Sequence, residues 1–532
     1  MPSMTPPATV FQRRILIGVG ICVVAFSLVG VRLVDVSVLR GGAPAVKHSA
    51  PVRHLRADLV DRNGELIARS LPADDLYARP HLLKDRRRAA HELAVATGIS
   101  ERRLTKLLAS NYRSVLIAKR LAPDTRAKVA MLKLPGLEYL PNSRRYYPDG
   151  RMTAQVVGLT DPDGNGVSGL EYGLDKTLRQ GGGPVTTSLD MRVQFIVAHE
   201  AQAAMTEFRA HAAGGLVMDV RTGEVLAMVS LPDFDPNARD FLGTKAARNI
   251  MAQDVYELGS VFKIFAFAMA LEGRTIRLDE QLSIGNGLKI GRYTIHEAEK
   301  MPATLAARDV LAQSSNIGTA QIALRTGPDG QRAFLAKLGL LSDVRSELPE
   351  RARPLYPEHW GTVETATIGF GHGISVSPLA FAAAAAVVVN GGRRIVPTFL
   401  KHSRDARGEQ VIPAETSAEM RRLLRYVVTD GTGKKADVPG YDVGGKTGSA
   451  EKPAPRGYHS NKLITSFCAV FPIENPRYIV FVMLDEPHGT KATGGFALAG
   501  YTAAPLAGHV VSRIAPLLGV PMNPITLTNG NT

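Results

Sequence analysis

The residues best suited to covalent chemistry are a serine and a lysine in an otherwise apolar stretch, Ser260 and Lys263. Residues three apart lie on the same face of a helix, so the lysine amine is expected within reach of the serine hydroxyl. A lysine taken out of water has a lowered pKa and can act as a base for a serine nucleophile. The pair alone equally fits a serine helix cap followed by a lysine whose amine reaches solvent.

Two later stretches extend this pattern. "LAQSSNIGTA" holds Ser314 and Asn316, and "DVGGKTGSAEK" holds the run Lys446–Ser449. Each alone also fits a helix cap or a polar loop. The ordered set S-x-x-K, S-x-N and K-T-G, spread over about 190 residues, is the combination found in class A β-lactamases and penicillin-binding proteins. This order makes chance a poor explanation.

The composition limits the classes to which this protein can belong. With 532 residues, 45% hydrophobic and 21% charged, the chain has a globular composition and the length of more than one domain. Its two cysteines, Cys22 and Cys468, cannot form a disulfide framework, and no spacing of ligand residues predicts a metal site. The formal charge of +15 is diffuse and accompanies no nucleic-acid-binding motif, so we expect no nucleic-acid partner.

The N-terminus predicts a membrane anchor. An uncharged apolar run, Ile15–Val31, follows Arg13 and Arg14 and is near the short end of what crosses a bilayer core. Because positive flanks stay in the cytoplasm, residues 1–14 are expected inside, with the anchor and its flank at 15–39. A cleaved signal peptide is the alternative, but its small-residue site would lie too far beyond the apolar run.

The rest of the chain divides into three further segments and a tail. Residues 40–52 read as a Gly/Pro/Ala linker, 53–185 as an accessory domain, 186–518 as the domain with the chemistry, and 519–532 as a tail. In the accessory domain, "RADLVDRNGELIA" predicts two short strands around an Asn-Gly turn. The periodicity from about Asp85 to Leu134 predicts helices.

The larger domain is predicted to be α+β. Ala213–Ser230 reads as a hairpin, and Lys462–Pro487 as two more strands joined by a Pro-containing turn. Helical stretches fill the sequence between them. Strands at both ends with helices between indicate an antiparallel sheet covered by helices.

These motifs resemble those of class B penicillin-binding proteins, the membrane-anchored peptidoglycan D,D-transpeptidases. The likeness runs from the anchor to about Leu518 and includes "RADLVDRNG", "YPDGRMTAQVVGLTD", "GLEYGLD", "LVMDVRTGEVLAMVSLPDFDPN" and "TIGFGHGISVSPL". Departures are small. Leu258 stands where many relatives have proline, and Ser449 stands where many have threonine. Ser315 is the middle residue of S-x-N, where β-lactamases often have a different residue. None removes a group that the reaction needs.

The resemblance implies acyl transfer through a serine. Ser260 is the nucleophile and Lys263 the base. Ser314 passes a proton toward the leaving nitrogen, and Asn316 hydrogen-bonds Lys263 and the substrate backbone. Lys446 supplies positive potential for the substrate carboxylate.

The remaining groups bind and polarise the substrate. Thr447 and Ser449 offer hydroxyls to the carboxylate. The backbone N–H groups of Ser260 and Ser449 are the candidate oxyanion donors. Any Cβ at Gly448 is expected to obstruct a substrate lying along the strand. The mechanism requires no cofactor.

The resemblance also implies partners and a location. The expected ligands are stem peptides, lipid-linked nascent glycan strands and β-lactams. The expected place is the bacterial inner membrane, with a single anchor and a periplasmic catalytic domain. The short N-terminal tail and the accessory block look like division transpeptidases, which predicts a septal glycosyltransferase and other division proteins as partners.

Three alternatives remain open at this point. One is an elongation-specific transpeptidase, which would share all three motifs. Another is a serine β-lactamase or D,D-carboxypeptidase, in which water replaces the acceptor amine. The last is a membrane sensor or scaffold that only binds β-lactams.

Overall fold

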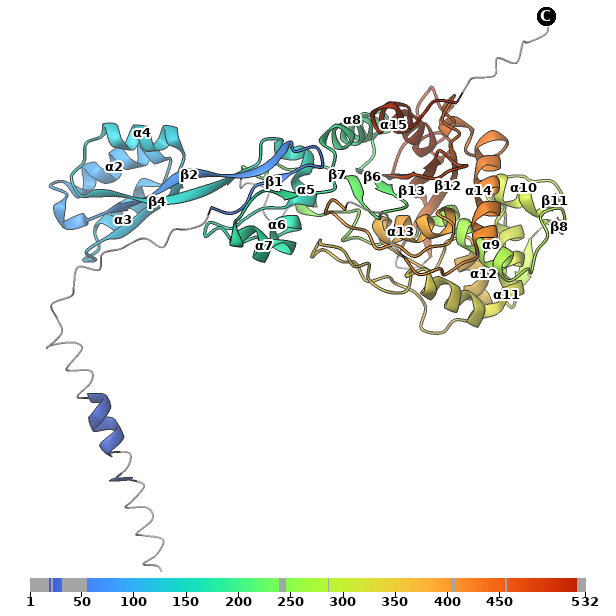
Figure 1. Ribbon diagram of the computed structural model, residues 1–532, viewed down its shortest axis with the longest axis horizontal. Coiled ribbons are helices and arrows are strands. Elements are labelled where there is room, and N and C mark those ends of the chain that lie inside the picture. Colours follow the sequence, from blue (N-terminus) through green and yellow to red (C-terminus); the bar gives the residue numbers. More distant parts are fainter. Residues whose placement is uncertain are drawn as a thin grey trace, which may run out of the picture. The chain divides into compact units, whose positions relative to one another are not determined.

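The computed structural model describes residues 19–20, 23–30, 55–238, 245–285, 287–402, 408–454 and 457–523 (Figure 1). The chain divides into two compact units, Met1–His54 and Leu55–Thr532. Each unit is described by itself below.

In the first unit, residues 23–30 are helical and exposed. The described part of the chain contains no helix that is both long and apolar enough to span a membrane. The predicted tail (1–14) and linker (40–52) lie outside the described residues, as do 15–18, 21–22 and 31–39 of the predicted anchor. The membrane anchor therefore stays a prediction.

The second unit begins with an accessory part built on two long strands, β2 and β4, which pair antiparallel along their length. β3 adds to one side of β2, and three helices bury their apolar faces against these strands. In chain order the elements are β1 (Leu59–Val60), β2 (Leu66–Ala78), η2 (Pro80–Leu82), α2 (Arg86–Thr97), α3 (Glu101–Leu108), β3 (Val115–Leu121), α4 (Pro123–Met131), β4 (Leu137–Tyr146), η3 (Gly150–Thr153), α5 (Ala154–Val157), α6 (Gly169–Gly173), α7 (Asp175–Gln180) and β5 (Val185–Thr186).

The predicted turn between two strands near residue 63 is confirmed, with Asp61 accepting hydrogen bonds from the backbone N–H groups of Asn63 and Glu65. The prediction of helices throughout 85–134 is wrong over β3. Val115 and Ile117 are buried on alternate positions of this strand, and pairing with β2 outweighs the local helical pattern.

A buried ion triad holds the base of the accessory part together. The Glu171 carboxylate, with no exposed surface, accepts from Arg56 Nε at 2.5 Å and from Arg145 Nε at 2.6 Å. Arg56 also pairs with Asp175 at 2.6 Å. Both arginines are almost wholly buried, so Glu171 compensates the charge of Arg145 and shares that of Arg56 with Asp175.

The larger part is organised around one antiparallel sheet, ordered β12-β13-β14-β6-β7. Alternate residues of β14 face opposite sides: Ile479 and Phe481 enter one core cluster, while Val480 and Val482 enter the other. This period of two is what a strand buried on both faces requires. The predicted hairpins at 213–230 and 462–487 are confirmed.

Helices cover both faces of this sheet, so the predicted α+β class is confirmed. α8 and α15 pack on one face, and α9, α13 and α14 cover the other (Figure 1). The elements are α8 (Met191–Glu207), β6 (Ala212–Asp219), β7 (Val225–Leu231), η4 (Lys245–Ala247), η5 (Gly259–Phe262), α9 (Lys263–Glu272), β8 (Gln281–Ser283), β9 (Leu288–Ile290), β10 (Tyr293–Ile295), β11 (Thr304–Ala306), α10 (Ala307–Ala312), α11 (Asn316–Lys337), α12 (Thr362–Gly369), α13 (Pro378–Val389), α14 (Ala414–Thr429), η6 (Lys434–Ala436), β12 (Gly444–Pro453), β13 (Tyr458–Phe471), β14 (Tyr478–Asp485) and α15 (Ala503–Leu517).

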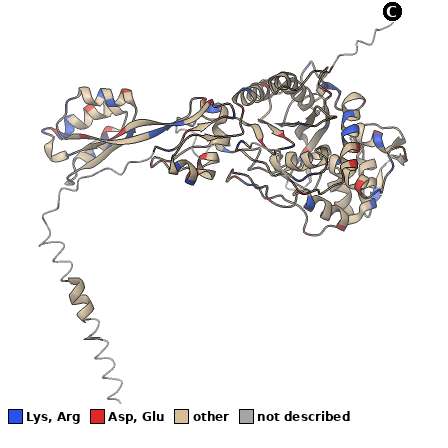
Figure 2. Ribbon diagram, viewed as in Figure 1, with Lys and Arg blue, Asp and Glu red and all other residues tan. Residues whose placement is uncertain are grey.

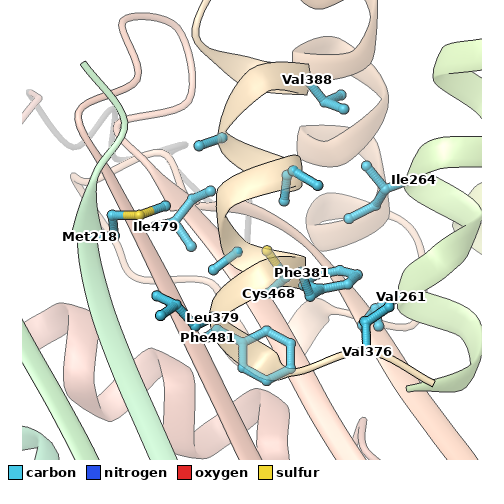
Figure 3. Close-up of a cluster of buried hydrophobic side chains, with 14 of the residues drawn as sticks. Met218, Val261, Ile264, Val376, Leu379, Phe381, Val388, Cys468, Ile479 and Phe481 are labelled. Atoms are coloured by element: carbon cyan, nitrogen blue, oxygen red, sulfur yellow. The ribbon is translucent and has the colours of Figure 1, made fainter. Parts of the chain in front are cut away.

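α13 is the central packing element between α9 and the sheet (Figure 3). Every residue of this helix is buried. The ring of Phe381 lies 5.3 Å from that of Phe265 on α9 and 5.2 Å from that of Phe481 on β14. The position of α9 relative to the sheet is thus set by aromatic packing in a close-packed core.

Charged side chains are spread over the described surface. Figure 2 shows Lys and Arg on both the accessory and the larger part, with Asp and Glu among them. In this part of the molecule the positive residues are thus interspersed with negative ones.

Removing the Glu171 carboxylate tests the triad. Glu171→Ala leaves the buried Arg145 without its carboxylate partner and Arg56 with Asp175 alone, so the free energy of unfolding should fall by about 3–5 kcal/mol. Chemical denaturation measures this loss. The control is Glu92→Ala, which breaks the exposed pair Arg88–Glu92 and should change stability by less than about 0.5 kcal/mol. Equal effects of the two variants would contradict the role of the triad.

Candidate active site

The site is built where the start of a helix meets the outer strand of the sheet. Ser260 is the second residue of η5, which continues into α9 at Lys263. A Cβ on Gly259 would lie 2.8 Å from the carbonyl oxygen of Ser449, and one on Gly448 would lie 2.5 Å from that of Leu258. Two glycines therefore allow η5 to approach β12 closely.

This contact gives Gly448 a packing role that the sequence did not reveal. Its added Cβ would also lie 2.7 Å from Ser466 Oγ and 2.9 Å from a methyl carbon of Val261. The close neighbours of Gly448 thus belong to the protein itself. The predicted obstruction of a bound substrate stays a prediction.

Lys263 is wholly buried, and its amine is directed at the second motif. It donates to Asn316 Oδ1 at 2.8 Å, to Ser314 Oγ at 3.2 Å and to the Ser314 carbonyl oxygen. All three acceptors are neutral. The amine is therefore held by hydrogen bonds without a carboxylate partner.

Lys446 reaches the same serine from β12. This lysine is also wholly buried and donates to Ser314 Oγ at 3.0 Å and to Thr447 Oγ1 at 3.2 Å. Thr447 Oγ1 lies 2.7 Å from Thr432 Oγ1. The Ser314 hydroxyl consequently lies between two lysine amines.

A sharp turn between α10 and α11 presents Ser314. Its φ of 64° is in the left-handed region, which is unfavourable for a residue with a Cβ. Such strain persists only where surrounding contacts impose it, and it is frequent at functional sites. Ser315 caps α11 through Gly318 N–H, which leaves Asn316 as the first helical residue facing Lys263.

Burial favours the neutral form of both lysine amines. It lowers the pKa of Lys446 from its ordinary 10.5 to about 7. The pKa of Lys263 also lies well below its ordinary value, mainly through burial and secondarily through the nearby Lys446 charge, whereas Glu297 opposes the shift. A neutral amine near neutral pH is what a lysine base needs.

Ser260 itself is half-buried. Its hydroxyl has no hydrogen-bond partner among the described residues, and the Lys263 amine is bonded to Ser314 and Asn316 instead. Ser449 Oγ accepts from Ala499 N–H at 3.0 Å. The structure thus brings together the predicted Lys263, Ser314, Asn316, Lys446 and Thr447 through hydrogen bonds, and Ser260, Gly448 and Ser449 through the packing of η5 on β12.

Two groups beside the site were not predicted from the sequence. Glu257 accepts from Gly373 N–H at 3.1 Å and from Tyr458 Oη at 3.3 Å, and burial raises its pKa. The His372 ring packs against Tyr458, and burial together with the Lys263 charge lowers its pKa to about 4. Glu257 lies within "YELGS", three residues before Ser260, and its polarity beside an apolar stretch was the available signal.

Glu297 is a further residue that the sequence analysis missed. It contacts the turn at Ser315 and Asn316 from a loop 18 residues away in the chain. No local pattern links the two segments. Among the described residues, no group of three or more His, Cys, Asp or Glu side chains could hold a metal ion.

Comparison with known proteins gives two family matches. Residues 213–506 match the penicillin binding protein transpeptidase domain, and residues 51–196 match the penicillin-binding protein dimerisation domain.

Individual relatives agree with these matches. The chain is 38% identical to a probable peptidoglycan D,D-transpeptidase FtsI of Caulobacter vibrioides, over 90% of this chain and 84% of that protein. It is 28% identical to the peptidoglycan D,D-transpeptidase FtsI of Escherichia coli K12, over 90% and 85%. Penicillin binding protein 3 of Mycobacterium tuberculosis, solved with aztreonam, matches with a TM-score of 0.70 at 26% identity, covering 88% of this chain and 97% of that one.

The lowered pKa of Lys446 predicts a pH dependence of stability. Between pH 7 and about 10.5 the unfolded chain binds a proton at this residue that the folded chain does not, so the free energy of unfolding rises with pH in this window. Lys446→Met removes the titrating group. The increase in the free energy of unfolding between pH 7 and 10 should then be smaller, by about a few kcal/mol at most. Denaturation at pH 7, 8, 9 and 10 measures the difference.

The matched control is Lys434→Met, which changes an exposed lysine. Its pH profile should run parallel to that of the unaltered protein. A Lys446→Met profile that also runs parallel would mean that Lys446 carries its full charge in the folded state.

Proposed function

The chain belongs to the class B penicillin-binding proteins, and on that premise we propose that it is a peptidoglycan D,D-transpeptidase of septal wall synthesis. It transfers an acyl group between stem peptides through a serine ester. The observation that carries the proposal is a wholly buried Lys263 with a lowered pKa, three residues after a half-buried serine.

Acylation is the first half of the reaction. Ser260 Oγ attacks the carbonyl carbon of the penultimate D-alanine, and its proton passes to the neutral Lys263 amine. The peptide C–N bond then breaks, and the terminal D-alanine leaves as an amine after receiving a proton by way of Ser314. Ser314 is suited to this relay because its hydroxyl is within 3.2 Å of Lys263 Nζ and 3.0 Å of Lys446 Nζ.

Deacylation reverses the roles. An amine of a neighbouring stem attacks the ester carbonyl, loses a proton to the same relay and forms the cross-link while Ser260 is released. Backbone N–H groups of Ser260 and Ser449 stabilise the oxyanion in both halves. Removal of one such donor in other enzymes costs about 2.7–4 kcal/mol of transition-state stabilisation.

The remaining residues position the donor strand. In its protonated form Lys446 provides positive potential for the terminal carboxylate, and Thr447 and Ser449 provide hydroxyl groups. Asn316 holds both Lys263 and the substrate backbone. Gly448 lets η5 pack closely on β12, because a Cβ there would meet the Leu258 carbonyl oxygen. β-Lactams acylate the same serine because they present a reactive amide beside a carboxylate.

The location follows from the premise. Residues 15–39 anchor the protein in the inner membrane with residues 1–14 inside, which places the catalytic part in the periplasm. Gly18, Gly20, Ala25 and Gly30 permit close contact between the anchor and another membrane helix, and a septal glycosyltransferase with other division proteins is the proposed partner set.

The alternatives differ in measurable ways. A β-lactamase or carboxypeptidase would hydrolyse its acyl-enzyme rapidly, a sensor would never turn over a stem peptide, and an elongation enzyme would act along the side wall. The two-part match, a dimerisation domain followed by a transpeptidase domain, favours the transpeptidase.

Covalent labelling tests the nucleophile. Ser260→Ala should abolish labelling by a fluorescent penicillin, because it removes the hydroxyl proposed to attack the β-lactam carbonyl. Mass spectrometry of the labelled peptide should place the adduct on Ser260 in the unaltered protein. Thr447→Ser, which keeps the hydroxyl, serves as the control and should retain labelling. An adduct on Ser314 or Ser449 would refute the assignment.

Depletion in the host tests the septal role. Cells that lose the protein should elongate without dividing, and the tagged protein should gather at midcell, because its substrate strands are made there. Fluorescence microscopy measures both. Swollen cells with the protein dispersed along the side wall would point to the elongation enzyme instead.

A further inference from the structure

A carboxylate outside the three motifs reaches the turn that carries the second one. β9 and β10 form a small hairpin, and Glu297 follows β10 by two residues. The side chain is half-buried. The hairpin therefore delivers an acidic group to the start of α11 from a separate segment of the chain.

The Glu297 carboxylate uses both oxygens on this turn. Oε1 accepts from Ser315 Oγ at 2.5 Å and from Ile317 N–H at 2.9 Å, while Oε2 accepts from Asn316 N–H at 2.7 Å. These donors belong to the first turn of the helix, where backbone N–H groups have no partner within the helix. Three bonds to one carboxylate fix the rotation and position of this turn.

The two residues on either side of Ser315 are those that bind Lys263. Asn316 Oδ1 and Ser314 Oγ accept from the Lys263 amine, and Ser314 adopts a left-handed φ of 64°. A displacement of the turn would therefore move both acceptors together. Glu297 is linked to Lys263 through a single intervening residue.

Glu297 also contributes charge. The charged groups that act on Lys263 are Lys446 from β12 and Glu297 from this loop, and the Lys263 charge in turn acts on His372 from the loop after α12. Lys446 lowers the Lys263 pKa, whereas Glu297 raises it. Two buried lysines thus share a pocket in which Glu297 supplies the opposing negative charge.

We propose that Glu297 is a positioning residue for the transpeptidase reaction, which holds the Ser314–Asn316 turn against Lys263 and sets the charge balance of that lysine. The proposal rests on the proposed function, because it assumes acylation of Ser260 with Lys263 as the base. It differs from an ordinary helix cap, whose removal would weaken the helix without changing how Lys263 titrates.

The test is the pH dependence of the acylation rate with a fluorescent penicillin, measured on the full chain. Glu297→Gln keeps the shape but loses the charge and turns one acceptor into a donor facing Asn316 N–H. The rate should fall about ten- to hundredfold, as expected for loss of a hydrogen bond to a charged group. Because the charge raises the Lys263 pKa, its loss should also move the acid limb of the profile to lower pH.

Two further variants separate position from charge. Ser315→Ala removes one of the three hydrogen bonds to Glu297, together with the bond from Gly318 N–H, and keeps the charge, so the rate should fall while the acid limb stays in place. Glu297→Asp keeps the charge on a shorter side chain and should behave like Ser315→Ala. These two variants keep the proposal testable if Glu297→Gln does not fold.

The matched control is Glu364→Gln, since Glu364 also caps a helix, by accepting from Gly361 N–H at 3.0 Å. It should leave both the rate and the profile unchanged. A Glu297→Gln rate within twofold of the unaltered protein, or a reduced rate with an unmoved acid limb, would overturn the proposal. Undiminished rates in both Glu297→Asp and Ser315→Ala would overturn it as well. If the unaltered protein itself were not acylated at Ser260, the proposed function would fail instead.

Discussion

Two lysine amines buried against one serine hydroxyl are the constraint on which the rest of the structure depends. Taking an ammonium group out of water is so unfavourable that a buried lysine tends to lose its proton. Lys263 and Lys446 lie within 3.2 and 3.0 Å of Ser314 Oγ and have no exposed surface. The fold therefore loses stability by keeping two lysine amines, in their neutral form, beside the Ser314 hydroxyl. Such a trade of stability for function is common at active sites.

The surrounding elements pack closely around the two buried lysines. α13 is buried at every position and packs through Phe381 against both α9 and β14. Close contact between η5 and β12 depends on Gly259 and Gly448, where a Cβ would meet a backbone carbonyl. Lys263 is thus held by α9, and Lys446 by β12. Ser314 lies in a strained turn, whose position Glu297 fixes through three hydrogen bonds. Substrate would enter a site whose polar groups are already oriented, which is the arrangement that favours transition-state stabilisation.

Much of this arrangement could be predicted from the sequence, for identifiable reasons. Ser260 and Lys263 are close in the chain, so helical spacing predicts that they share a face. The order of the three motifs indicated the family, which the matched domains confirm. β3 was missed because its strand pairing with β2 overrides a local helical pattern. Glu297 and His372 were missed because their roles come from contacts between segments that no spacing rule connects. The roles of the site residues and the domain boundaries stay predictions.

The most direct measurement is a lysine side-chain NMR titration of the protein labelled with ¹³C at lysine Cε. Spectra of Lys263→Met and Lys446→Met would assign the two signals. The account predicts that the Lys446 signal titrates near pH 7 and the Lys263 signal well below 10.5, apart from the exposed lysines. Titration of both signals near pH 10.5, together with the exposed lysines, would contradict it, because a fully protonated Lys263 cannot accept the proton of Ser260.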